Sequence, residues 1–226
     1  MSQPEGVYPR LELGPEPHGR PFVCINMVAT IDGKTVTGGR NEHVQDLGSD
    51  TDHATMRQIE AACDAVLVGA GSMRATKGMW FPEGVLRVVA TASGDVPPDR
   101  RFFTDDPGAA FVATTSRGAA SVPPGLKTIV CGEDSIDWQA LLKELKETHG
   151  VQRLLLEGGS EINASLLAHD LVDELFLTVA PKVKLGRGVP TYAGGDPLPR
   201  EGMLGFHIVS SQTVGDEIFV RYRRDR

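Results

Sequence analysis

Two glycine-rich turns are the part of this chain whose residue types and spacing most directly suggest chemistry. The stretches VLVGAGS (66–72) and LLLEGGS (154–160) each run from apolar residues into glycines and a serine. Glycine allows positive φ and a close approach of ligand to backbone, and the first N–H groups of a following helix attract anions. The turns therefore favour a phosphate or diphosphate ligand, although a tight strand-to-helix turn alone would need the same glycines.

The spacing of these glycines is not that of the common nucleotide motifs. The sequence contains neither G-x-G-x-x-G after a strand nor G-x-x-x-x-G-K-[ST], so neither a standard dinucleotide fold nor a P-loop is indicated. In the second turn, Ser160 is expected to cap the helix that follows.

Two carboxylates are candidates for proton chemistry. Glu157 lies between three leucines of a buried strand and the glycines, where an unpaired charge would be costly, so we expect it to meet donors from protein or ligand. Asp32 lies in the turn TIDGK (30–34). A structural role remains open for both, since Glu157 could be a partnered acid and Asp side chains commonly brace turns.

Four other side chains could serve the same site. His43 and His53 could titrate near a substrate, and Met79 and Trp80 could cover a ring. Lone histidines are more often surface residues, however, and a loop of this composition more often packs against the core.

Composition limits the class of protein. The 226 residues are 40% hydrophobic, enough for a sizeable core, and 23 basic against 30 acidic residues give a net charge of −7. This excess of acidic residues argues against non-specific binding of nucleic acid, which needs clustered Lys and Arg. The basic stretch RYRRDR (221–226) is short, and we interpret it as a solvated last strand.

The cysteines and the hydropathy pattern indicate a soluble, cytoplasmic protein. Cys24, Cys63 and Cys131 lie far apart without C-x-x-C spacing, which argues against a zinc site or a disulfide framework and fits a reducing compartment. No run approaches 18 apolar residues, so no membrane segment is expected. No metal site is predicted, and a small-molecule substrate is the expected partner.

The order of the elements predicts an α/β fold. Alternating strands and helices imply a mostly parallel central sheet with helices on both faces, and residues 203–224 predict an antiparallel C-terminal hairpin. Residues 1–20 are interpreted as a flexible N-terminal arm and 21–226 as one domain. Strands are expected at 21–29, 64–71, 85–90, 109–114, 127–132, 151–157 and 173–181, and helices at 48–63, 134–150 and 160–170.

Several of these stretches together resemble a known family. NMVATIDGK (26–34), DAVLVGAGS (64–72), LLLEGGSEIN (154–163) and residues 171–190 are similar, in order and spacing, to the C-terminal reductase domain of the riboflavin-biosynthesis deaminase–reductase and to stand-alone pyrimidine reductases. The resemblance implies a dihydrofolate-reductase-like fold, NADPH as cofactor and a homodimer. The implied reaction opens and reduces the ribose of a ribosylamino-pyrimidine 5′-phosphate to the ribityl form.

The resemblance also implies roles for individual residues. Asn26, Asn41, Arg57 and Glu157 would contact the substrate, and Asp32 or Glu157 would orient proton transfer. Asn26 matches the archaeal-type reductases, which favours the 2,5-diaminopyrimidinone over the aminouracil substrate. The cofactor would lie against Ala29, Gly69, Gly71, Ser72, Thr76, Thr91, Ser93, Gly158, Gly159, Ser160 and Glu161.

Departures from the family pattern keep other functions open. Glu60 stands where the family carries a phosphate-binding arginine, and Thr76 where it carries an acid. Arg57, Arg74 or Lys77 could substitute for that arginine. The H-x-E and P-C-x-x-C signature of the deaminase does not occur, so a reductase alone is expected. The alternatives are an NADPH-dependent reductase of another heterocyclic imine, such as a pterin, and a non-catalytic dimeric nucleotide-binding module.

Overall fold

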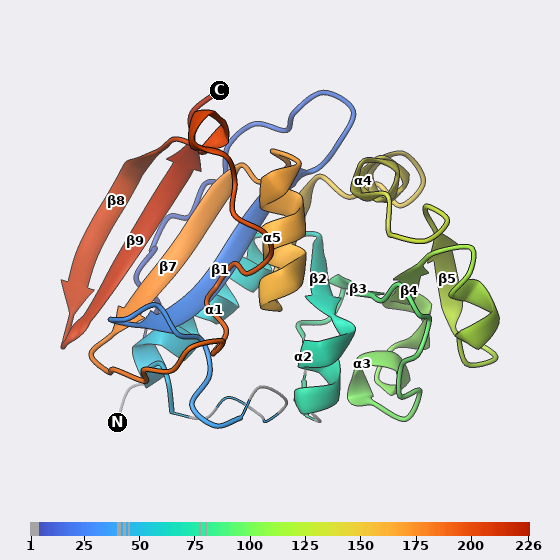
Figure 1. Cartoon of the computed structure of the whole chain (residues 1–226), viewed down its shortest axis with the longest axis horizontal. Helices are drawn as coiled ribbons and strands as arrows, with labels where there is room; N and C mark the ends of the chain where they lie inside the picture. The colour runs from blue at the N-terminus through green and yellow to red at the C-terminus, as the bar shows by residue number, and fades with distance from the viewer. Residues whose placement is uncertain (1–4, 40–41, 43, 45, 77, 80) are drawn as a thin grey trace.

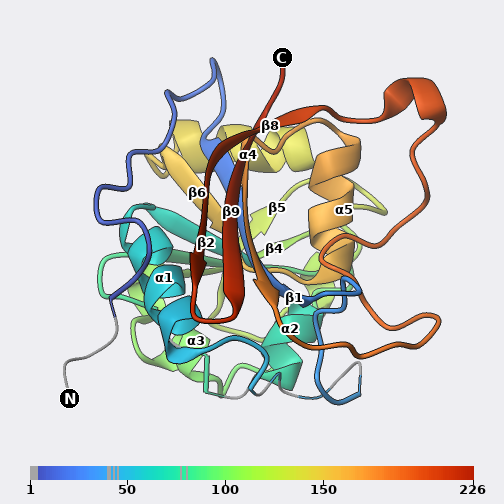
Figure 2. The same ribbon diagram turned by 90° about the vertical axis from the view of Figure 1, so that its left-hand side faces the viewer.

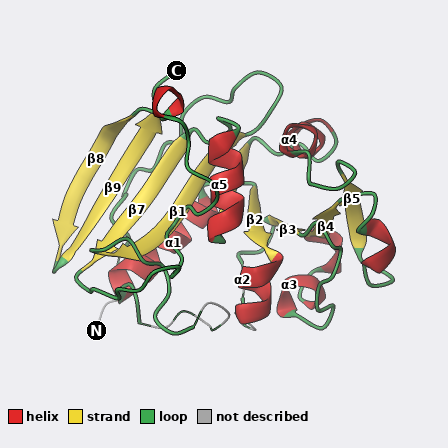
Figure 3. Cartoon of the chain, in the orientation of Figure 1, coloured by secondary structure: helices red, strands yellow, loops and turns green. Residues whose placement is uncertain are grey.

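A nine-stranded sheet forms the centre of the molecule (Figures 1 and 3). The computed structural model describes residues 5–39, 42, 44, 46–76, 78–79 and 81–226. The strands are β1 (Phe22–Thr30), β2 (Ala65–Gly69), β3 (Leu86–Ala90), β4 (Ala110–Thr114), β5 (Lys127–Val130), β6 (Arg153–Leu156), β7 (Glu174–Ala180), β8 (Phe206–Val214) and β9 (Glu217–Arg224).

The order across the sheet is β5-β4-β3-β2-β6-β1-β7-β9-β8. All pairs from β5 to β7 are parallel, whereas β9 pairs antiparallel with both β7 and β8. The predicted mostly parallel sheet with an antiparallel C-terminal hairpin is thereby confirmed. Parallel strands run in the same direction, so their carboxyl ends, and the loops that follow them, lie together at one end of the strands.

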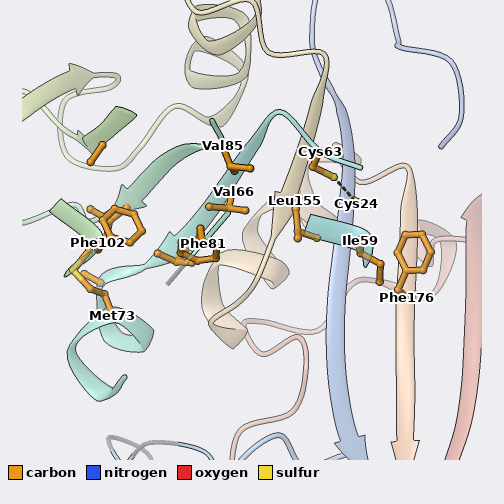
Figure 4. Close-up of a cluster of buried hydrophobic side chains, with 14 of the residues drawn as sticks. Cys24, Ile59, Cys63, Val66, Met73, Phe81, Val85, Phe102, Leu155 and Phe176 are labelled. Atoms are coloured by element: carbon orange, nitrogen blue, oxygen red, sulfur yellow. Dashed lines mark hydrogen bonds between the residues drawn. The ribbon is translucent and has the colours of Figure 1, made fainter. Parts of the chain in front are cut away.

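Helices cover both faces of the sheet. Side chains along each strand point alternately to the two faces, and on each face they form a buried cluster with the helices. On one face, Leu155 and its neighbours pack against α1 (Asp50–Ala61), α2 (Ala70–Ala75) and α3 (Arg101–Thr104), as Figure 4 shows in part. On the other face, Leu154 and Leu156 belong to the cluster of α4 (Trp138–Glu147) and α5 (Ser160–Ala168). Three single turns of 3₁₀ helix lie at Pro107–Ala109, Ala119–Ser121 and Arg200–Gly202.

Local sequence sets the ends of the two longest helices. Ser49 is the N-cap of α1, and its hydroxyl accepts from the N–H groups of Thr51 and Asp52, which satisfies two donors that the helix leaves open. Asp137 caps α4 by accepting from the N–H of Ala140. Gly150, just beyond α4, has φ +69, a conformation that glycine adopts at little cost. The short helices α2 and α3 were not among the expected elements.

The hairpin is joined to the parallel strands by a buried ion cluster. Glu174 on β7 has no exposed side-chain surface and accepts from Arg221 at 2.8 Å and Arg223 at 2.7 Å. Both arginines belong to β9, so the basic stretch near the end of the chain compensates a buried acid. Asp173 is held in the same way by Arg20 at 2.7 Å and by Arg226.

Residues 5–20 lie against the body of the protein, which the expectation of a loose arm did not anticipate. In Figure 2 this segment runs beside α1 at the edge of the molecule. Val7 and Tyr8 are buried, and the Tyr8 ring meets Phe176 edge-on at 5.3 Å. The N–H of Val7 donates to the Thr55 hydroxyl at 3.1 Å, and its carbonyl accepts from Gln212. The backbone N–H and carbonyl of Val7 are therefore paired with side chains of α1 and β8.

The structure also bears on the membrane expectation. In the described residues, no helix is both long enough and apolar enough to span a bilayer.

We expect Leu155→Ala to lower the free energy of unfolding by about 2–5 kcal/mol, because it opens a cavity at a position with no exposed surface. Urea denaturation followed by circular dichroism measures the change. The control is Leu198→Ala, whose wild-type side chain is exposed in a loop and whose loss should stay within about 0.5 kcal/mol. Equal effects of the two variants would contradict the central position of β6.

Candidate active site

A cavity of about 500 Å³ opens where β2, β3 and β6 end, a size typical of small-molecule sites. The glycine turns that follow β2 and β6 both line it. Ten of the residues expected at a ligand site are among the lining residues: Gly69, Gly71, Ser72, Thr76, Thr91, Glu157, Gly158, Gly159, Ser160 and Glu161.

The two glycine turns contact each other through the backbone. The N–H of Gly69 donates to the carbonyl of Gly158 at 2.9 Å, so the turn after β6 is fixed against the end of β2. Gly158 has φ +77, and a side chain there would stand 3.4 Å from the Met27 sulfur. A residue with a Cβ would strain this turn, which explains the glycine independently of any ligand.

Ser160 does not act as the predicted helix cap. The N-cap of α5 is Gly159, which has no side chain to offer, and Ser160 is the first helical residue. The Ser160 hydroxyl is buried in the cavity wall and has no hydrogen-bond partner among the described residues. A buried polar group without a partner carries a penalty, which a ligand oxygen at this helix start would remove.

The turn after β2 leaves room at the cavity. A Cβ built on Gly71, in the first turn of α2, would meet no atom within 4 Å, and one on Gly159 would lie 3.2 Å from the Ser72 hydroxyl. Gly71 and Ser72 therefore present a small, polar surface beside the start of α5. A flat or extended anionic group could approach both helices closely here.

The third strand end contributes one hydroxyl to the cavity. Thr91, directly after β3, lines the cavity, and its Oγ1 lies 3.1 Å from the hydroxyl of Ser93. Ser93 itself lies outside the lining, so its expected cofactor contact would have to run through Thr91. Thr76, at the end of α2, also lines the cavity.

Glu157 belongs to a buried acidic cluster. Its carboxyl group lies within hydrogen-bonding reach of that of Glu60, which is fully buried on α1. Arg57 donates to both oxygens of Glu60, at 2.9 and 2.6 Å. Burial, and then the neighbouring Glu60 charge, raise the pKa of Glu157 well above its usual range. Arg57, expected to contact the substrate, does not line the cavity. It contacts Glu60 instead, one helical turn further along α1.

The remaining expected substrate and cofactor residues lie at different depths. Asn26 is half-buried on β1, and by strand alternation it shares the face of Cys24, the face that α1 covers. Ala29 is buried in β1 and does not line the cavity. Asn41 lies outside the described residues, as do His43, Lys77 and Trp80.

Asp32 braces a loop and lies outside the cavity lining. Its carboxylate accepts from the Thr30 hydroxyl at 2.6 Å and from the N–H groups of Lys184 at 3.0 Å and Leu185 at 2.8 Å. The Thr30 hydroxyl and these backbone donors lower the pKa of Asp32 to about 2. Leu185 has φ +60, a strained conformation for leucine that the hydrogen bond helps to hold.

Part of the lining came from segments without a recognisable sequence signal. The loop after β1 contributes Thr35 and Val36, and Pro190 arrives from the long connection between β7 and β8. The Asn163 side chain anchors that connection by donating to the Tyr192 carbonyl at 2.8 Å. Met79, one of the two candidates for covering a ring, lines the cavity and packs against the core cluster of Figure 4.

Comparison with known proteins identifies relatives. The family described as RibD C-terminal domain matches residues 21–220. The 2,5-diamino-6-ribosylamino-4(3H)-pyrimidinone 5′-phosphate reductase of Methanothermobacter thermautotrophicus is 28% identical over an alignment of 217 residues, which covers 90% of this chain and 98% of that protein.

Solved structures show the same fold. Acinetobacter baumannii RibD, form 1, has a TM-score of 0.75 at 19% identity over 92% of this chain, and the match spans 59% of that protein. Dihydrofolate reductase from Enterococcus faecalis, complexed with NADP(H) and RAB-propyl, has a TM-score of 0.53 at 11% identity over 91% of this chain and 97% of that one. The predicted dihydrofolate-reductase-like fold is confirmed.

We expect Asp32→Ala to loosen the loop at 182–188 while turnover falls by less than about 100-fold, the lower range for loss of a general acid or base. Hydrogen exchange of the Lys184 and Leu185 amides measures the loosening. Because the pKa of Asp32 is lowered from 3.8 to about 2, wild-type protection should be complete above pH 3.8 and lost as the pH falls towards 2. A larger loss of turnover with unchanged exchange would return Asp32 to a catalytic role.

Proposed function

The chain belongs to the RibD C-terminal domain family, and on that premise we propose that it is an NADPH-dependent pyrimidine reductase. Its substrate would be the compound named for the Methanothermobacter relative, 2,5-diamino-6-ribosylamino-4(3H)-pyrimidinone 5′-phosphate. The product would be the ribityl form of the same compound, as a step of riboflavin biosynthesis.

The observation that carries the proposal is the meeting of two glycine turns and an acid in one cavity. The turns after β2 and β6 expose glycines, and the buried Ser160 hydroxyl beside them lacks a partner among the described residues. These features suit the diphosphate of a dinucleotide at the start of α5. Glu157 lines the same cavity, so cofactor and substrate can lie next to each other.

The residues of this chain would hold the cofactor mainly through backbone groups and hydroxyls. Gly158, Gly159 and Ser160 would contact the diphosphate, with Gly71 and Ser72 on its other side. Thr91 supports an adenosine-side contact, because its hydroxyl reaches the cavity from the end of β3. When bound, the reduced nicotinamide supplies the hydride, and the protein's task is to position the reacting carbon.

The substrate would lie toward the α1 face of the cavity. Glu157 would contact it directly, and Asn26 lies on the same face of the adjoining strand β1. Glu60, which replaces the family's phosphate-binding arginine, is fully buried and would leave the 5′-phosphate to another group. Among the described residues that line the cavity, Arg74 on α2 is the one with a cationic side chain, and we expect it to take that task.

The direct test is oxidation of NADPH, followed by its absorbance, with this pyrimidine phosphate as substrate. Turnover with NADPH and much weaker turnover with NADH supports both the reaction and the cofactor. Tight NADPH binding without turnover would contradict this substrate and favour an unphosphorylated heterocycle such as a pterin. Binding without turnover on any imine tested would favour a non-catalytic nucleotide-binding module.

We expect Gly71→Ala to weaken NADPH binding about tenfold or more without loss of stability. The added methyl would occupy open space at the cavity wall, while alanine in a helix is favoured over glycine by about 0.5–1 kcal/mol. Titration calorimetry and thermal melting measure the two effects. The control is Gly78→Ala, which also meets no atom within 4 Å but does not line the cavity. Unchanged affinity in Gly71→Ala would contradict the diphosphate site.

The proposal includes a cytoplasmic homodimer that binds neither nucleic acid nor membrane. The net charge of −7 argues against a nucleic-acid partner. Exposed apolar side chains on the hairpin support association of two chains. Ile208 pairs in register with Tyr222, four residues from Ile218, so Ile208 and Ile218 share one face of the sheet.

We expect Ile218→Lys to convert the dimer into a monomer of 24.2 kDa, because a charge would replace an apolar side chain that is 45% exposed in the single chain. Light scattering measures the mass, and Val130→Lys, at the opposite edge of the sheet, is the control. A monomeric wild-type chain, or equal effects of both variants, would contradict dimerisation through the hairpin.

A further inference from the structure

Two acidic side chains form a pair between helix α1 and the cavity. Glu60 is fully buried near the end of α1, and Glu157 lines the cavity after β6. The two carboxyl groups lie within hydrogen-bonding reach of each other. Carboxylate oxygens only accept, so a hydrogen bond between them forms only when one of the two groups carries a proton. Consistently, Oε1 of Glu157 is buried, and no N–H or O–H of the described residues donates to it.

The charges around the pair also indicate that one of the two carboxyl groups is protonated. Arg57 donates to both oxygens of Glu60, and one guanidinium cannot neutralise two adjacent carboxylates. With one proton the cluster is neutral, whereas without it a net negative charge would remain in a buried place. Among the described residues, the other titratable or charged groups that face Glu157 or its cavity are Cys63 beyond α1, Arg74 on α2, Glu161 on α5 and Glu42 in the loop after β1.

The position of Arg57 decides which carboxyl carries the proton. Its guanidinium contacts Glu60 at 2.6 Å, which favours the ionised form of Glu60. Burial raises the pKa of Glu60 as well, and its contacts with Glu157 and Arg57 offset only part of that rise. For Glu157 both burial and the adjacent Glu60 raise the pKa. Glu157 is therefore the protonated member, and it is also the member that reaches the cavity.

We propose that Glu60 is a positioning residue that keeps a proton on Glu157, so that Glu157 meets the substrate as a carboxylic acid. This inference rests on the proposed reductase function for the identity of the acceptor, the nitrogen of the opened ribosylamine. It assigns to Glu60 a role of its own, in place of the phosphate contact that an arginine at this position would make.

The proton completes the reduction of a carbon–nitrogen double bond. The carbon would accept the hydride that a bound reduced nicotinamide supplies, leaving that ring oxidised, and the nitrogen would accept the proton from Glu157. The double bond becomes a CH–NH single bond, and Glu157 is left as a carboxylate. Glu60 and Arg57 then favour its reprotonation from water, because two adjacent carboxylates with one guanidinium remain negative.

The pH profile of turnover tests this role of Glu60. We expect wild-type kcat to be level through neutral pH and to fall on the alkaline side as Glu157 loses its proton. In Glu60→Gln the negative neighbour is gone, and the Arg57 charge acts on Glu157, so the alkaline limb should move to lower pH by about one unit or more. Glu60→Asp, which keeps the charge, should restore the limb toward the wild-type position.

Controls separate this effect from a loss of structure. Asp52→Asn, on the same helix but outside the cavity lining, should leave the limb in place, and circular dichroism should show each variant folded. Glu157→Gln should lower kcat by about 100-fold or more and remove the limb. An unshifted limb in Glu60→Gln would overturn the inference.

Infrared spectroscopy tests the proton without any substrate. The wild-type chain at neutral pH should show a protonated-carboxyl band that is lost in Glu157→Gln and weakened in Glu60→Gln. Turnover without this band would overturn the inference and leave the proposed function standing. The band without turnover would support the shared proton and overturn the proposed substrate.

Discussion

The pairing of β6 between β1 and β2 is the interaction on which the site depends. This four-residue strand is held in register on both sides, with Leu155 opposite Cys24 and Val66. The ladder ends at Leu156 opposite Leu67 of β2, and one further hydrogen bond runs from the N–H of Glu157 to the carbonyl of Leu67 at 3.2 Å. The chain must then turn away, and the position of the acid and the glycines relative to β2 is fixed by the sheet.

Two of the buried acidic sites on the α1 face of the sheet are compensated differently. Glu174 on β7 faces two guanidinium groups, those of Arg221 and Arg223. In the part of the chain that the structure describes, the pair of Glu60 and Glu157 has one, that of Arg57. A buried acid with enough positive partners stays ionised. An acid short of one positive charge retains a proton, and a retained proton beside a cavity is available for chemistry.

The sequence predicted those features of the fold and the site that depend on backbone conformation. Glycines at strand ends predicted the cavity wall because they mark positive φ and close approach, and the order of strands and helices predicted the sheet. The roles of single side chains were harder to predict from the sequence. Asp32 and Glu157 both follow strands, but only the structure shows that Asp32 accepts from the distant loop at 184–185. The meeting of Glu60 with Glu157 likewise depends on how α1 packs on the sheet, which no local pattern encodes.

The docking of residues 5–20 has a consequence for the way the chain acquires its structure. Val7 accepts a hydrogen bond from Gln212, a separation of 205 residues, and Glu12 accepts one from Arg221. Contacts between such distant positions are slow to form, because a long loop must close before they contribute. During synthesis residues 5–20 leave the ribosome long before β8 and β9, so these contacts can form only after those strands have followed. The contacts of Val7 and Glu12 with β8 and β9 are therefore expected to be a late event in folding.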